Sequence, residues 1–258
     1  MAVPAEWITP RWPAPANVRA VCTTRAGGRS RAPYESLNLG DHVGDSAQAV
    51  AANRAVFAAA LQARPVFLKQ VHGLHSVRLD ADTPEGIEAD GCVTTTRGVA
   101  CTIMVADCLP VLFAAADGRA VAAAHAGWRG LAEGAGRNIL EAVWIRFREL
   151  AQLRSPDQTL AWLGPCIGPD AFEVGPEVKT VFDSNDPVAT ALFKAQRDGK
   201  WLADLAGLAR RRLHALGITR VYGNDGSREW CTVSNPSRFF SHRRDRISGR
   251  FAAGIWLP

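Results

Sequence analysis

The sequence predicts an α+β fold in which layered, mixed β-sheets are flanked by helices. Short segments of apolar and β-branched residues, such as residues 99–105, follow one another through the middle of the chain. Such segments are typical of strands that are covered on both faces. The helical segments separate runs of strands and do not follow each strand in turn. Strict alternation would indicate a doubly wound parallel sheet, so we expect mixed layers instead.

Each expected element follows from its local pattern. An alanine-rich helix is predicted over residues 47–63, and it ends before Pro65 because the residue preceding a proline disfavours helical geometry. Helices are also predicted over residues 131–150 and 202–216, where apolar residues recur at helical spacing. Strands are predicted at residues 18–24, 66–72, 76–80, 91–96, 99–107, 110–116, 120–127, 159–164, 219–223, 238–243 and 251–257.

Composition places the chain among ordinary globular proteins. It has 258 residues, of which 47% are hydrophobic and 21% charged, and this length can bury a large core without disulfides. Because no linker, repeat or low-complexity tract interrupts it, we expect one domain spanning residues 1–258. No apolar stretch approaches the roughly 20 residues that cross a bilayer, and the N-terminus does not resemble a signal peptide. We therefore expect a cytoplasmic protein with no membrane partner.

The net charge and the cysteines further narrow the class of protein. A net charge of +5 is modest; it suits phosphate-bearing ligands but does not indicate nucleic acid. We expect the protein to be a monomer. The six cysteines contain no C-x-x-C pair, which excludes a zinc ribbon and a thioredoxin-type motif. In a cytosolic chain we expect these cysteines to be free thiols or metal ligands.

Three residues that can bind a metal stand at the ends of predicted strands. His72 ends residues 66–72, Cys108 follows residues 99–107, and His125 lies near the end of residues 120–127. Side chains from separate strands can converge at such edges. Two imidazoles and a thiolate leave one coordination position open, as in catalytic zinc sites. The residues alone leave an alternative open, namely buried core histidines and an inert buried cysteine.

Long motifs in unbroken order give the chain a family resemblance. KQVHG, IMVADCLPVLF and AAHAGWRG are flanked by TTRAGG and SLNLGDHVGD on one side and by GPCIGP, FEVG, RFFSHRRD and SGRFAAGIWL on the other. From about Cys22 to Pro258 the chain resembles the YfiH-like family, also called multicopper polyphenol oxidoreductase or laccase-domain proteins. The resemblance implies an α/β arrangement similar to the catalytic domain of cytotoxic necrotising factor. It also implies that His72, Cys108 and His125 are zinc ligands.

The same resemblance implies purine chemistry. It predicts a zinc-dependent purine nucleoside phosphorylase that converts adenosine, inosine, guanosine or methylthioadenosine, with phosphate, to the free base and ribose 1-phosphate. An adenosine deaminase activity is expected beside it. The chain lacks the H-x-E and P-C-x-x-C motifs of known zinc deaminases, so deamination would need a different proton shuttle. Asp107 is a candidate for that role, although alternation along a strand would point it away from Cys108.

Two other functions stay open. A copper-dependent polyphenol oxidase, or laccase, would also use histidine and cysteine ligands. However, the internal methionine, Met104, would lie about 13 Å from Cys108 along one strand, and six histidines are few for a multicopper cluster. A zinc-stabilised binding module without activity is the second alternative, although structural zinc normally recruits four ligands.

Further residues near predicted turns are candidates for binding phosphate or nucleoside, each with a structural ion pair or turn as the alternative. These candidates are Arg25, Asn38, Arg129, His242 and Arg243. We expect Cys166 to be a buried, unreactive thiol and not a nucleophile. The other histidines, at positions 42, 75 and 214, are expected to lie outside the metal site.

Overall fold

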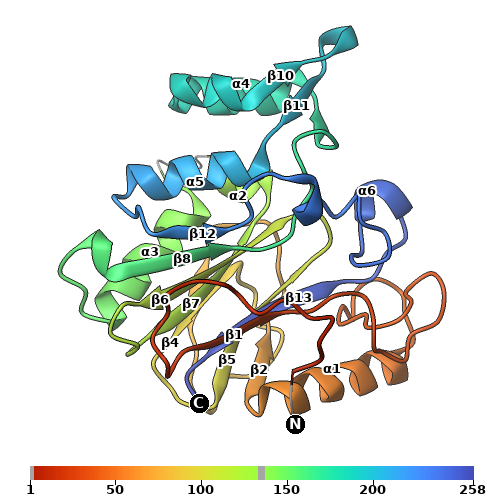
Figure 1. Cartoon of the computed structure of the whole chain (residues 1–258), viewed down its shortest axis with the longest axis vertical. Helices are drawn as coiled ribbons and strands as arrows, with labels where there is room; N and C mark the ends of the chain where they lie inside the picture. The colour runs from red at the N-terminus through yellow and green to blue at the C-terminus, as the bar shows by residue number, and fades with distance from the viewer. Residues whose placement is uncertain (1–2, 133–136) are drawn as a thin grey trace.

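Two β-sheets pack face to face at the centre of the molecule, and helices cover their outer faces (Figure 1). The computed structural model describes residues 3–132 and 137–258. One central sheet has the strand order β1 (Arg19–Cys22), β13 (Phe251–Trp256), β5 (Val99–Val105) and β2 (Arg64–Phe67). The other has the order β12 (Val221–Gly223), β8 (Thr159–Leu163), β6 (Leu109–Ala115), β7 (Val121–Ala126), β4 (Gly91–Thr94) and β3 (Ser76–Arg78).

Both sheets are mixed, which confirms the predicted fold class. Strand β2 runs parallel to β5, β3 to β4, and β12 to β8, whereas the other neighbours in these two sheets are antiparallel. A smaller antiparallel sheet has the order β10 (Phe193–Ala195), β11 (Trp201–Ala203) and β9 (Glu173–Val174). The small sheet lies beyond the helices that cover the six-stranded sheet (Figure 1).

The central strands are apolar on both faces because each face meets a different core. Every residue of β5, β6 and β7 is buried. Along β6, Val111 and Phe113 belong to the core under the helices, whereas Leu112 and Ala114 belong to the core between the sheets. This alternation is what a strand with buried residues on both faces requires.

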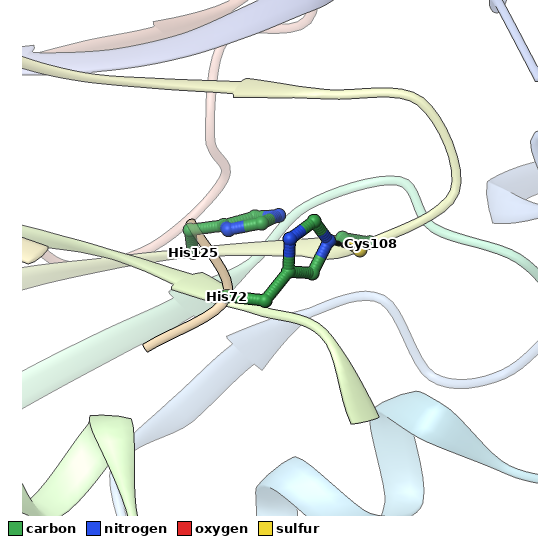
Figure 2. A group of neighbouring side chains, drawn as sticks. All are labelled: His72, Cys108 and His125. Carbon is green, nitrogen blue, oxygen red and sulfur yellow. Dashed lines mark hydrogen bonds between the residues drawn. The ribbon is translucent and has the colours of Figure 1, made fainter. Parts of the chain in front are cut away.

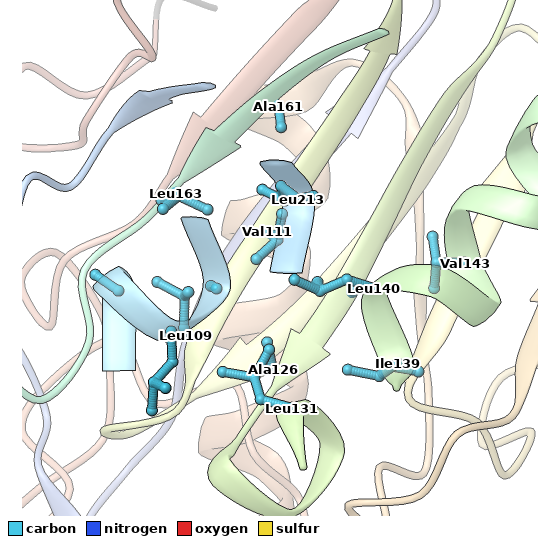
Figure 3. Close-up of a cluster of buried hydrophobic side chains, with 14 of the residues drawn as sticks. Leu109, Val111, Ala126, Leu131, Ile139, Leu140, Val143, Ala161, Leu163 and Leu213 are labelled. Carbon is cyan, nitrogen blue, oxygen red and sulfur yellow. The ribbon is translucent and has the colours of Figure 1, made fainter. Parts of the chain in front are cut away.

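Helices on the two outer faces complete a helix–sheet–sheet–helix order of layers. Helices α3 (Ile139–Leu150) and α5 (Leu205–Ala215) cover the six-stranded sheet. In Figure 3, Leu140 of α3 and Leu213 of α5 lie near Val111 of that sheet, whereas Val143 of α3 lies apart from them and packs against Gly91 of β4. Helix α1 (Ala47–Leu61) packs against the outer face of the four-stranded sheet.

Shorter helices complete the chain. They are α2 (Trp128–Leu131), α4 (Pro176–Asn185), α6 (His242–Asp245) and the 3₁₀ helices Pro156–Gln158, Pro187–Leu192, Arg197–Gly199 and Arg228–Trp230. Within the described ranges, no helix combines the length and the apolar character that crossing a bilayer requires.

Three predicted elements differ most from the structure, and the helix predicted over residues 202–216 begins only at Leu205, because Leu202 and Ala203 belong to β11. The helix predicted over residues 131–150 begins at Ile139, because the Asn138 side chain accepts hydrogen bonds from the Leu140 and Glu141 amides and caps α3 there. Residues 133–136 of the prediction, including Ala135, lie outside the described residues.

The other two differences are strands that the structure shortens or replaces. The strand predicted over residues 66–72 ends at Phe67, so His72 lies in a loop. The strand predicted over residues 238–243 is not formed: Phe239 and Phe240 are buried in the core between the sheets but lie outside any strand. Ser241 then caps α6 by accepting a hydrogen bond from the Arg244 amide.

Candidate metal centre

Three segments of chain meet at one end of the two central sheets. His72 comes from the loop after β2 of the four-stranded sheet, and His125 comes from β7 of the six-stranded sheet. Cys108 lies in the connection between β5 and β6, which passes from one sheet to the other. Figure 2 shows the side chains of His72 and Cys108 beside each other, with His125 next to them. The predicted convergence of these three residues is therefore present.

The spacing of the three side chains suits a metal ion. The donor atoms of His72, Cys108 and His125 all lie within 4.8 Å of one another. The Cys108 Sγ is 3.7 Å from the His72 Nε2, and the two imidazole ring centres are 4.7 Å apart at 69°. In the part of the chain that the structure describes, this is the one group of three or more histidine, cysteine or carboxylate ligands close enough to hold an ion. Two imidazoles and a thiolate are the donor types that bind zinc and copper.

A fully buried carboxylate, Asp90, organises the site. Its Oδ1 accepts hydrogen bonds from the His125 Nδ1 at 2.8 Å and from the His72 amide at 2.9 Å. Its Oδ2 accepts from the Gly73 amide at 2.7 Å and the Val71 amide at 3.2 Å. The bond to Nδ1 leaves the Nε2 of His125 as the atom that faces Cys108. This arrangement of carboxylate, histidine and metal position is common in metalloproteins.

The same carboxylate stabilises an uncommon backbone conformation. His72 has a φ of 61°, in the left-handed region that residues other than glycine seldom adopt. Three successive amides of this loop point at Asp90, which forms a small anion-binding turn. Gln70 fixes the loop from the other side, because its side chain donates to the Met104 carbonyl and accepts from the Met104 amide, each at 2.8 Å.

Cys108, His125 and Asp90 ionise as a linked set, in which a bound cation would take the place of the proton on His125. Burial alone would raise the pKa of Cys108, but His125 and then His72 outweigh it and lower this pKa to about 6. Burial alone would lower the pKa of His125, but Cys108 and Asp90 raise it to about 9. For Asp90, burial opposes ionisation, and the bonds from His125 and the loop amides hold its pKa below the ordinary value. The thiol is therefore ionised at neutral pH, as a metal ligand must be.

A glycine allows the close approach of these groups. A Cβ atom at Gly127 would lie 3.0 Å from the Cys108 Sγ and 3.1 Å from the His72 Cδ2. Either contact is tighter than most side chains tolerate, so a larger residue here would displace the ligands. The close approach therefore accounts for a glycine in the segment Ala-Gly-Trp that follows His125.

The metal centre opens into a cavity of about 550 Å³. Its walls combine apolar and aromatic side chains with several cations. Besides the three ligands, the lining residues are His42, Gln70, Met104, Val105, Ala106, Asp107, Trp128, Arg129, Ile167, Phe172, Leu205, His242, Arg243, Arg246 and Arg250. A concave site with an apolar lining and a few convergent polar groups is typical of small-molecule binding.

Three of the five further candidates lie on this cavity. Arg129 is exposed, and its guanidinium carbon lies 4.4 Å from the centre of the Trp128 ring. The Nη1 of Arg243 donates to the Glu173 carbonyl at 2.9 Å. His242 is exposed at the start of α6.

The other two candidates do not line the cavity. Arg25 donates to the Glu35 and Pro236 carbonyls at 2.7 and 3.0 Å, so it links two loops. Asn38 is fully buried, and its side chain bonds to Gly40, Asp45 and the backbone amide of Arg250. The contacts of Arg25 and Asn38 are therefore those of residues that hold loops and turns in place, which was the alternative to substrate binding.

The position of Asp107 differs from the one that the sequence predicts. It lines the cavity, because β5 ends at Val105 and residue 107 lies outside any strand, with a φ of 90°. The alternation of a strand therefore does not apply to it, nor does the premise that Met104 and Cys108 share a strand. Both carboxylate oxygens of Asp107 are engaged, one by the Thr232 hydroxyl and one by the Arg243 amide, each at 2.6 Å.

The cysteines and the remaining histidines mostly match expectation. All six cysteines are free. Cys166 is buried, and burial raises its pKa, which agrees with an unreactive thiol. His75 is exposed and contacts the Glu88 carbonyl. His42 is exposed but lines the cavity, which the sequence did not indicate.

The sequence analysis missed Asp90, Gln70 and Arg250. Each stands next to a quoted motif or inside one: Gln70 in KQVHG, Arg250 in SGRF, and Asp90 just before the strand GCVT. Polar residues beside candidate ligands are a usable signal, because metal-binding histidines normally need an outer hydrogen-bond partner. Which carboxylate supplies it depends on how the strands pair, and the sequence does not specify that pairing.

Comparison with known proteins identifies the family. The family described as multi-copper polyphenol oxidoreductase laccase matches residues 19–258. The chain belongs to this family. The resemblance found in the sequence motifs is thus confirmed, and the matched region contains all three members of the candidate metal centre.

Relatives across the family align over nearly the whole chain. A purine nucleoside phosphorylase of Pseudomonas aeruginosa is 49% identical over 97% of this chain and 98% of its own length. The purine nucleoside phosphorylase YfiH of Escherichia coli is 46% identical over 98% of this chain and 99% of its own length. A crystal structure of a DUF152 protein from Neisseria meningitidis superposes with a TM-score of 0.90 at 44% identity, covering 98% of this chain and 99% of that chain.

Proposed function

We propose that this protein is a zinc-dependent purine nucleoside phosphorylase. Its substrates are adenosine, inosine, guanosine or methylthioadenosine together with phosphate, and its products are the free base and the sugar 1-phosphate. The observation that carries the proposal is one cavity that joins a three-ligand metal centre to aromatic walls and to several arginines. Relatives that are 49% and 46% identical over nearly their whole length are named purine nucleoside phosphorylases.

The cavity walls suit the two substrates. Trp128 and Phe172 offer aromatic surfaces against which a purine can pack. Arg129 and Arg243 lie beside those two rings and can bind anionic oxygens in a fork geometry. A nucleoside held between these groups would have its glycosidic bond close to a bound phosphate, which is the positioning that this reaction needs.

The donor set supports zinc as the metal. His72, Cys108 and His125 would hold the ion, with Asp90 fixing the orientation of His125. A bound zinc ion would supply a Lewis acid at an open coordination position. The residues of the chain would bind the phosphate, pack against the purine base and keep the Cys108 thiolate ionised.

Copper-dependent phenol oxidation is the second candidate, and the family description mentions it. A multicopper oxidase needs several copper centres, yet among the described residues a single group of three possible ligands is found. Of the other histidines, His42 and His242 are exposed on the cavity and His75 contacts a backbone carbonyl. This arrangement favours one metal ion, and we therefore prefer purine chemistry.

Adenosine deamination is proposed as a side activity at the same centre. In that reaction water attacks C6 of adenine, and the amino group leaves as ammonia. Asp107 lies on the cavity, but both of its oxygens already accept hydrogen bonds, so a structural role accounts for its contacts. We also propose that the protein is a monomer in the cytoplasm; a binding module without enzymatic activity is the remaining alternative.

Product analysis tests the function. Adenosine or inosine is incubated with protein of measured metal content, with and without phosphate, and the products are separated by chromatography. We expect about one zinc per chain, free base and sugar 1-phosphate only with phosphate, and some inosine from adenosine in both conditions. Equal base release in both conditions would contradict phosphorolysis. Absence of purine turnover combined with oxygen consumption on phenols would favour the oxidase, and absence of both would favour the binding module.

A further inference from the structure

Arg250 lines the cavity and is held in place by several hydrogen bonds. Its backbone amide donates to the Oδ1 of the buried Asn38 at 2.8 Å, and its carbonyl accepts from the Leu39 amide. Its Nη1 donates to the Ser248 and Gly249 carbonyls at 2.8 and 3.1 Å. These bonds fix one edge of the guanidinium and leave its Nε and Nη2 without a hydrogen-bond partner among the described residues.

Among the residues that the structure describes, this cation forms no ion pair. The ion pairs between described residues do not include Arg250. The side chain is half-buried, and burial lowers its pKa, an effect that the negative charges of Cys108 and Asp107 partly offset. Asp107 is itself bonded to Thr232 and the Arg243 amide. A partly desolvated guanidinium with free donors is costly unless an anion pairs with it.

The other cavity arginines differ from Arg250. Arg129 is exposed and stacks on Trp128, and Arg246 is exposed after α6. Arg243 is tied to the Glu173 carbonyl and lies 5.6 Å from the Phe172 ring centre. Arg250 differs from these three in its position near Cys108, whose charge acts on it.

We propose that Arg250 binds the attacking phosphate, next to the metal centre, and that Arg129 and Arg243 contact the remainder of the substrates. This assignment rests on the phosphorylase function proposed above. In the reaction, an oxygen of hydrogen phosphate forms a bond to C1′ of the sugar while the bond between C1′ and the purine nitrogen breaks. The electron pair of that bond stays on the base, and the proton of the phosphate passes to the base. Arg250 orients the phosphate and neutralises part of its charge.

Substitution of Arg250 tests the assignment with two separate measurements. The first is the KM for phosphate and the KM for inosine in phosphorolysis. The second is the rise in melting temperature that inorganic phosphate causes in the zinc-loaded protein without nucleoside. For Arg250→Gln we expect the phosphate KM to rise by about tenfold or more and the inosine KM to change by less than about threefold, because one charge-assisted, two-pronged contact is lost. The thermal shift with phosphate should be lost as well.

Two further variants make the result specific. Arg197→Gln removes an equal charge from an exposed position that does not line the cavity, and it should leave the phosphate KM within about twofold. Arg250→Lys keeps the charge but loses the fork, and should raise the phosphate KM by a few-fold. If Arg250→Gln does not fold, the phosphate KM and the thermal shift of Arg250→Lys alone test the assignment. Zinc content is measured in every variant.

Several outcomes would overturn the assignment. One is a wild-type phosphate KM and thermal shift in Arg250→Gln, or in Arg250→Lys if that variant must decide. Equal increases in both KM values would show a structural role. An Arg250-dependent thermal shift with adenosine 5′-monophosphate but none with inorganic phosphate would assign the anion to a nucleotide instead. If phosphorolysis itself is absent, the proposed function fails, and the phosphate thermal shift still decides whether Arg250 binds phosphate.

Discussion

At the scale of single residues, the members of the candidate metal centre could be named from the sequence, but the residue that orients them could not. His72, Cys108 and His125 stand in quoted motifs and have donor atoms that bind metals, so their chemistry is visible in the sequence. Asp90 acts through four hydrogen bonds to two different segments, the loop that carries His72 and the strand that carries His125. It meets His125 because β4 and β7 pair so that Gly91 lies opposite Ala124, and that register is a property of the folded sheet.

Asp90→Asn is expected to weaken metal binding while the chain stays folded. The amide nitrogen of asparagine is a donor, so it cannot accept hydrogen bonds from both His125 and the loop amides as the carboxylate does. Loss of such an outer partner typically lowers metal affinity by about 10–100-fold. Competition for zinc with a chelator measures the change. Glu88→Gln is the matched control, because Glu88 is exposed and pairs with Lys69. Wild-type zinc affinity in Asp90→Asn would contradict the orienting role.

At the scale of elements, the prediction worked where local pattern decides the structure. The central strands β5, β6 and β7 were predicted because their residues are apolar on both faces, and that property requires burial between two layers. Residues 238–243 were predicted wrongly because Phe239 and Phe240 resemble a strand, yet a serine cap turns the next residues into α6. The small sheet and α4 were not predicted. Strands of two or three residues leave too short a pattern to recognise.

The start of α3 gives a prediction at this scale. Asn138 caps the helix through its Oδ1, which accepts from the Leu140 and Glu141 amides at 3.0 and 3.1 Å. Asn138→Ala should therefore lower the free energy of unfolding by about 1 kcal/mol. Urea denaturation followed by circular dichroism measures this. Glu149→Ala, an exposed change in the same helix, should stay within about 0.5 kcal/mol of wild type. Equal stability of the two variants would show that the cap contributes little.

At the scale of the whole molecule, the core extends far beyond the metal centre. Three clusters of buried side chains lie under α1, between the two sheets, and under α3 and α5. The metal ligands lie at one end of the sheets, and Cys108 contacts the middle cluster only from its edge. A zinc finger, by contrast, lacks such a core and folds only with its metal. The single domain over residues 1–258 stays a prediction that agrees with this arrangement.

Cys108→Ala should consequently separate the fold from the activity. The substitution removes one of three ligands, so we expect bound zinc and purine turnover to fall below detection. The secondary structure measured by circular dichroism should stay close to wild type, because the sheets and their three clusters are unchanged and a small side chain is lost from the edge of one of them. His75→Ala is the control, since His75 is an exposed histidine outside the metal centre and should keep both zinc and activity. An unfolded Cys108→Ala protein would mean that the metal stabilises the fold itself. Turnover at the wild-type rate without bound zinc would mean that the reaction does not use this centre.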